Sequence, residues 1–179
     1  LLSQQIIPLD QQSAWHAACD EALELIAACA YPSSATGQFV LKDANAIRLH
    51  GDCHPGNVLW TPDGPHFVDF DDARMGPAVQ DLWMLLSGER REQERQLSAV
   101  LSGYEEFFAF DRRELYLVEA LRTLRLVHYA GWLAKRWEDP AFPAAFPWFN
   151  TQRYWQDRIL ELREQIAQME EPPLSVFGG

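Results

Sequence analysis

The chain has 179 residues, 47% of them hydrophobic, and a formal net charge of −11 from 26 acidic and 15 basic residues. This length can bury one core and leaves no room for a second full domain, so we expect a single domain over residues 1–179. The negative charge argues against nucleic acid and anionic membrane surfaces as partners, because their phosphates would be repelled.

Two further features of the sequence bear on its location. No apolar run reaches the roughly 20 residues of a membrane-spanning helix, and residues 1–5 lack the charged start of a signal peptide. The three cysteines have no C-x-x-C spacing, which argues against a disulfide framework and a structural zinc site. We therefore expect a cytoplasmic protein with reduced thiols.

The first predicted element is a helix over residues 12–30, where apolar residues recur at steps of three and four, with Asp10 as its cap. Proline, glycine and small polar residues predict a loop over residues 31–37. Residues 39–41 then form a short strand or an apolar plug, and residues 46–49 lead into the next motif.

The stretch LHGDCHPGNVLW, residues 49–60, carries the chemistry. After it, residues 58–60 are expected to form a strand, 61–65 a turn and 67–68 a returning strand, which predicts a hairpin that brings Asn57 beside Asp69. Asp52, Asn57 and Asp69 are the set that phosphoryl transfer needs. One carboxylate orients and deprotonates a hydroxyl, while an amide and a second carboxylate hold magnesium.

The rest of the chain is predicted to be mainly helical. Residues 74–77 turn the chain into a buried helix over 78–86, and residues 89–110 form an amphipathic helix that buries Phe107 and Phe108. Asp111 caps a long helix to about residue 137, with Leu124 among its buried positions. An aromatic, irregular link over 140–149 is pinned by ring burial. Thr151 starts a last helix, which runs to about residue 169.

The motif His50-Gly51-Asp52-x-x-x-x-Asn57, followed by Val68-Asp69, resembles the catalytic loop and metal-binding aspartate of the aminoglycoside phosphotransferase and choline kinase superfamily. The stretch FVDFDDARMGPAVQDLWMLLSG further resembles bacterial stress-response serine/threonine protein kinases of that superfamily. The resemblance implies a protein-kinase-like C-terminal lobe, α+β and mostly helical, with a small β-hairpin carrying the catalytic loop.

The resemblance also implies roles for individual residues. Asp52 is the catalytic base, Asn57 and Asp69 bind Mg²⁺, and Asp81 is a buried brace for the catalytic loop. ATP would be the co-substrate and a serine or threonine hydroxyl of a protein the acceptor. His50 is expected to orient the loop through its ring nitrogens. For Asp71 and Asp72, solvated carboxylates are favoured over support for a second metal ion.

The nucleotide-cradling parts of such a kinase are not found in the sequence. It contains no G-x-G-x-x-G, and neither Lys42 nor Lys135 follows the apolar strand that a phosphate-binding lysine needs. We therefore expect the chain to be a C-terminal lobe without its N-terminal lobe, inactive by itself.

Other functions remain open. A kinase for a small molecule such as an aminoglycoside, choline or homoserine shares this loop. A metal-dependent hydrolase would use His50, His54, Asp52 and Asp69 as ligands for zinc or manganese. A binding module that only docks a partner is a further alternative. A nucleophilic Cys53 is disfavoured, because sequence neighbours of a cysteine point in different directions.

Overall fold

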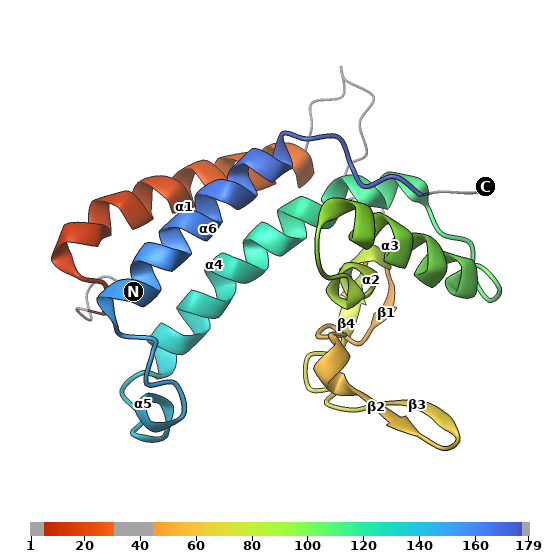
Figure 1. Cartoon of the computed structure of the whole chain (residues 1–179), viewed down its shortest axis with the longest axis horizontal. Helices are drawn as coiled ribbons and strands as arrows, with labels where there is room; N and C mark the ends of the chain where they lie inside the picture. The colour runs from red at the N-terminus through yellow and green to blue at the C-terminus, as the bar shows by residue number, and fades with distance from the viewer. Residues whose placement is uncertain (1–5, 31–44, 177–179) are drawn as a thin grey trace. The chain divides into compact units, whose positions relative to one another are not determined.

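The computed structural model describes residues 6–30 and 45–176 (Figure 1). Helices make up most of these residues and the strands form two small antiparallel pairs, which confirms the mostly helical α+β fold. The elements are, in chain order, α1 (Leu9–Ala30), β1 (Ile47–Leu49), η3 (Pro55–Asn57), β2 (Val58–Thr61), β3 (Gly64–Phe67), β4 (Arg74–Gly76), α2 (Val79–Leu82), η4 (Trp83–Leu85), α3 (Arg90–Tyr104), η5 (Arg112–Leu117), α4 (Val118–Arg136), α5 (Ala141–Ala145) and α6 (Gln152–Met169), where η marks a 3-10 helix.

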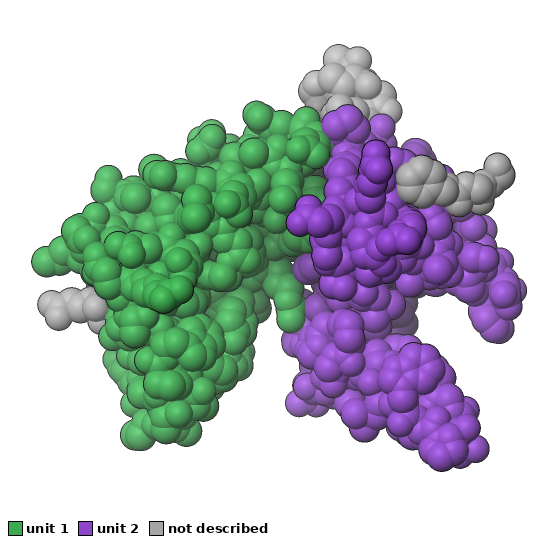
Figure 2. Space-filling model, in the orientation of Figure 1, with its two compact units in different colours: residues 1–29, 119–171 green, residues 30–118, 172–179 purple. Residues whose placement is uncertain are grey.

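The loop predicted for residues 31–37, the short strand or plug predicted for 39–41 and Lys42 lie outside the described residues. Within the described ranges, no helix combines the length and the apolar character needed to cross a membrane. The chain divides into two compact units, one of residues 1–29 and 119–171 and the other of residues 30–118 and 172–179 (Figure 2).

The first unit is built from α1, α6 and most of α4, with α5 in the link between α4 and α6 (Figure 1). The three long helices share one core, because each contributes a buried apolar stripe. Phe149 is fully buried in it, with its ring 4.9 Å from Trp137 and 5.5 Å from Trp155 between centroids. Ring burial therefore does pin the aromatic link, as expected, while the neighbouring Trp148 remains 43% exposed. Contrary to the prediction, the link is not irregular throughout, because it contains the short helix α5.

The second unit carries the predicted motif. Its core gathers around Val79, Leu97 and Leu101, which are at most 1% exposed. The predicted hairpin is confirmed: β2 pairs with β3 antiparallel, in a register that sets Val58 opposite Phe67. Its turn is shorter than the predicted 61–65, because Thr61 already pairs with Gly64, and the returning strand ends at Phe67. The hairpin extends from the rest of this unit (Figure 1), and Trp60 on it is 80% exposed.

One sheet pair was not predicted. Residues 74–76, expected to be part of a turn, form β4, which pairs with β1 so that Leu49 lies opposite Arg74 and Ile47 opposite Gly76. The reason is tertiary: three-residue strands carry too little pattern to be recognised, and this pair joins segments more than twenty residues apart. The pairing ties the chain entering the motif to the chain leaving it.

Several helix boundaries also differ from the prediction. The α1 helix begins at Leu9, because the carbonyl of Pro8 already accepts the Gln11 amide at 2.9 Å. Asp10 therefore lies in the first turn instead of capping it, where its charge still favours the helix dipole. The helix expected over residues 78–86 is shorter, with a single α-helical turn, α2, followed by the 3-10 turn η4.

The helix predicted to run to Phe110 ends at Tyr104. Edge-on packing of Tyr104 against Phe108 and Phe110 accompanies a reversal of the chain there, which buries Phe110 and leaves Phe107 89% and Phe108 50% exposed. The prediction that Phe107 and Phe108 lie on a buried face is therefore wrong.

Two predicted caps are confirmed, and one predicted buried residue is not. Asp111 accepts the Arg113 amide, although it begins the 3-10 helix η5 that precedes α4, and Thr151 accepts the Tyr154 amide at the start of α6. Leu124, expected to be buried, is 42% exposed.

Candidate active site

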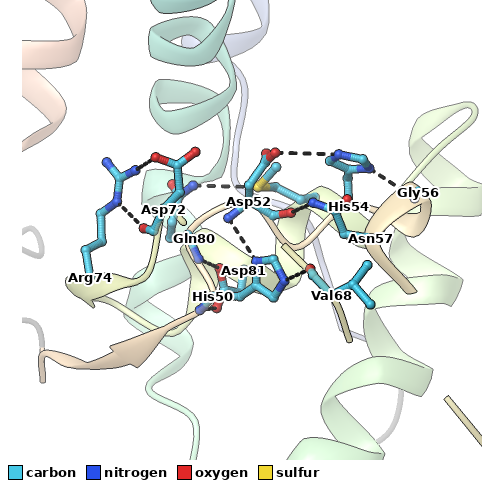
Figure 3. A network of polar contacts seen from close by, with 12 residues as sticks. His50, Asp52, His54, Gly56, Asn57, Val68, Asp72, Arg74, Gln80 and Asp81 are labelled. Carbon is cyan, nitrogen blue, oxygen red and sulfur yellow. Dashed lines mark hydrogen bonds and ion pairs between the residues drawn. The ribbon is translucent and has the colours of Figure 1, made fainter. Parts of the chain in front are cut away.

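Asp81 holds the Asp52 loop, by which we mean residues 50–57, through its backbone. Its Oδ2 accepts the amide of His50 at 2.7 Å and its Oδ1 accepts the amide of Gly51 at 2.9 Å (Figure 3). The carboxylate is half-buried, and these two bonds offset its partial desolvation. The prediction that Asp81 braces this loop is therefore confirmed, but the carboxylate is half-buried and not fully buried as predicted. Its amide partners precede Asp52 in the chain.

The ring of His50 links the Asp52 loop to the end of the hairpin. Its Nε2 donates to the carbonyl of Val68 at 2.8 Å, and its Nδ1 accepts the amide of Asp52 at 3.3 Å (Figure 3). An Nδ1 that accepts requires the neutral ring to carry its proton on Nε2. His50 thus orients the loop through both ring nitrogens, as the sequence predicted, and the residue is 8% exposed.

Asn57 joins the loop to the strand that returns from the hairpin. Its Nδ2 donates to the carbonyl of Asp52 at 3.0 Å, and its own carbonyl accepts the amide of Val68 at 3.1 Å. The bond to Asp52 uses the side-chain nitrogen of Asn57. The side-chain oxygen is the atom of this amide that can coordinate a cation. Asp69 follows Val68 directly, so the hairpin brings the backbone of Asn57 to the segment that leads into Asp69, as predicted. That the two side chains share a metal ion stays a prediction.

Asp69 has an unusual backbone conformation. Its φ of 63° lies in the left-handed region, which asparagine and aspartate tolerate better than most residues. Its side chain is exposed. Residues with a strained backbone are frequent at functional sites. A carboxylate and an amide oxygen are hard ligands, so the residues present fit Mg²⁺ better than zinc.

Gly51 is a residue that the sequence analysis did not single out. Its φ is +88°, and a Cβ placed there would lie 2.1 Å from the carbonyl oxygen of Asp72. Only glycine allows this close approach between the Asp52 loop and the chain after Asp69. The one signal in the sequence is a glycine between two polar residues of a motif, which is not specific by itself.

The neighbouring carboxylates of Asp71 and Asp72 are exposed to solvent. Asp72 pairs with Arg74 at 2.8 Å on the surface, with the two side chains 61% and 59% exposed. Asp71 is exposed as well. These positions agree with the solvated reading that the sequence favoured for both residues.

Cys53 is buried, and this burial, helped by the nearby charges of Asp81 and Asp52, raises the pKa of its thiol to about 11. The thiol therefore stays protonated near neutral pH and is a poor nucleophile. This supports the structural reading of Cys53.

The geometry argues against the alternative of a metal-dependent hydrolase. Both ring nitrogens of His50 already contact protein atoms, which leaves neither for a metal ion. Among residues 6–30 and 45–176, no group of three or more His, Cys, Asp or Glu side chains could hold a metal ion.

Comparison with known proteins places these residues in context. Residues 3–118 match the phosphotransferase enzyme family. The chain is 54% identical over 135 residues to stress response kinase A of Escherichia coli strain K12, covering 75% of this chain and 41% of that protein. It is 47% identical over 171 residues to the serine/threonine protein kinase RdoA of Salmonella typhimurium, covering 96% of this chain and 49% of that protein. The chain thus spans about half the length of the curated relatives it matches.

Proposed function

Because this chain belongs to the phosphotransferase enzyme family, we propose that it is the catalytic lobe of an ATP- and Mg²⁺-dependent kinase that phosphorylates a serine or threonine hydroxyl of a protein. The observation that carries the proposal is the bonding of the Asp52 loop. One network fixes Asp52, Asn57 and the segment leading to Asp69, through the side chains of His50 and Asp81.

The proposed roles follow from chemistry. Asp52 would orient the acceptor hydroxyl and take up its proton as the oxygen bonds to the γ-phosphorus and the bond from that phosphorus to ADP breaks. The side-chain oxygens of Asn57 and Asp69 would hold Mg²⁺, which would offset the negative charge of the ATP phosphates. Phosphoryl transfer asks little covalent chemistry of the protein, so a rigid loop that aligns these groups would supply most of the rate.

The names of the relatives support a protein acceptor. One is called a serine/threonine protein kinase and another a stress response kinase. We extend that acceptor class and a role in stress response to this chain as a proposal. A cytoplasmic location is proposed with them, since ATP is the co-substrate and all three cysteines are free. The net charge of −11 supports the absence of nucleic acid and membrane partners.

The share of the relatives' length that this chain covers bears on where the ATP phosphates would be bound. Since the chain spans 41% to 49% of their length, we propose that the residues cradling the ATP phosphates belong to another part of the protein. The chain alone is then expected to be inactive.

The test is transfer of labelled γ-phosphate from ATP to a generic protein substrate by the complete gene product that contains this chain. We expect labelling that needs Mg²⁺ and that falls by orders of magnitude in Asp52→Asn, while Asp69→Asn also loses the dependence on the metal. Normal turnover in either variant would contradict the assignment. Label that enters added small alcohols but no protein would move the acceptor to a small molecule.

A further inference from the structure

The ring of His54 has a defined position on the Asp52 loop. Pro55 disfavours a helical backbone at the preceding residue, and His54 adopts φ −95° and ψ 162°. The side chain then folds over the next turn, where the amide of Gly56 donates to its Nδ1 at 3.0 Å. A Cβ at Gly56 would lie 2.7 Å from the Cε1 atom of the ring, so glycine leaves the space that the ring fills.

This position of the ring determines which of its nitrogens faces Asp52 and whether that nitrogen carries a proton. Because Nδ1 accepts a hydrogen bond, the neutral ring carries its proton on Nε2. That Nε2 lies 3.5 Å from Oδ2 of Asp52, so an N–H faces the carboxylate (Figure 3). The contact is long for a hydrogen bond, as is common for catalytic contacts before the substrate binds and tightens them.

We propose that His54 is a positioning residue: its Nε2–H holds the Asp52 carboxylate in the orientation that receives the acceptor hydroxyl. The inference rests on the function proposed above and deepens it. Asp52 takes up the proton of the hydroxyl, and His54 gains or loses none. Its contribution is alignment, which dominates in a reaction where the base does little covalent work.

His54 also has a structural role, because it caps η3, the turn that ends in Asn57. Two substitutions separate this role from the contact with Asp52. In His54→Asn, the side-chain oxygen takes the place of Nδ1 and can accept the Gly56 amide, but no atom stands where Nε2 was. In His54→Gln, the terminal amide can take the place of Nε2 and donate to Asp52, but the cap is lost.

The experiment measures kcat and KM for ATP in the complete gene product, with Mg²⁺ and a protein acceptor. We expect His54→Asn to lower kcat roughly tenfold with KM for ATP unchanged. We expect His54→Gln to retain most of kcat and to raise KM for ATP, because the turn that carries Asn57 loosens. His16, exposed on α1, is the matched control, and the same two substitutions there should change neither constant.

Each other outcome overturns the proposal. A purely structural role predicts the opposite order, with Asn tolerated and Gln impaired in kcat, and equal or absent loss of kcat in both variants also refutes it. Thermal melts accompany the assays, and unfolding of His54→Asn would assign the ring to stability alone. If Asp52→Asn abolishes turnover while the His54 variants behave otherwise than expected, only this inference fails. If Asp52→Asn retains normal turnover, the proposed function fails with it.

Discussion

Replacing Asp81 tests the brace of the Asp52 loop. Asp81→Ala removes the acceptors of the His50 and Gly51 amides, at 2.7 and 2.9 Å. A hydrogen bond to a charged group contributes about 1.5–3 kcal/mol, and the low end applies because Asp81 is only half-buried and water can replace it in part. The two bonds together give a loss of about 3 kcal/mol in the free energy of unfolding. For a chain of this size, that lowers Tm by about 6–12 °C.

The assay combines thermal melting with amide hydrogen exchange. Exchange at His50 and Gly51 should accelerate selectively, since these amides lose their acceptors, while α6, in the other compact unit, should keep its protection. Asp63→Ala is the control, an exposed carboxylate at the hairpin turn whose loss should change stability by less than about 0.5 kcal/mol. The reasoning is refuted if Asp81→Ala costs less than about 1 kcal/mol and both amides stay protected.

Three further predictions concern stability. Gly51→Ala sets a Cβ 2.1 Å from a backbone oxygen at a left-handed φ, so Tm should fall by more than for Asp81→Ala; an unchanged melt would contradict the close approach. Ser175 donates its amide and hydroxyl to Glu94 and so lowers the pKa of that carboxyl below its ordinary 4.5. The stabilisation is therefore complete above pH 4.5 and is lost as the pH falls through the lower folded pKa. Urea unfolding should show Glu94→Gln about 2 kcal/mol less stable at neutral pH, with a gap that shrinks in acid; a constant gap would refute the linkage. Phe149→Ala should cost about 3–5 kcal/mol in the same assay and Trp148→Ala far less, and equal losses would refute the core assignment.

The sequence was informative wherever a pattern is local. Proline and glycine punctuation predicted the hairpin, and the hairpin predicted the meeting of Asn57 with the segment of Asp69. Helical periodicity predicted the long helices, and side-chain chemistry predicted the caps at Asp111 and Thr151. The prediction that Asp81 braces the loop came from the family resemblance, because composition alone favoured neither a buried nor an exposed position for this side chain. The catalytic and metal-binding roles of Asp52, Asn57 and Asp69 stay predictions.

What only the tertiary structure decided are contacts between segments that no local pattern connects. The pairing of β1 with β4 and the end of α3 at Tyr104 depend on partners elsewhere in the chain. The same holds for the close approach at Gly51 and for the His54 ring that faces Asp52. Periodicity and turn residues report the preferences of a segment for itself. The direction of a side chain and the distance between two loops follow only once the backbone between them is folded, and in this chain those distances determine which polar groups form the site.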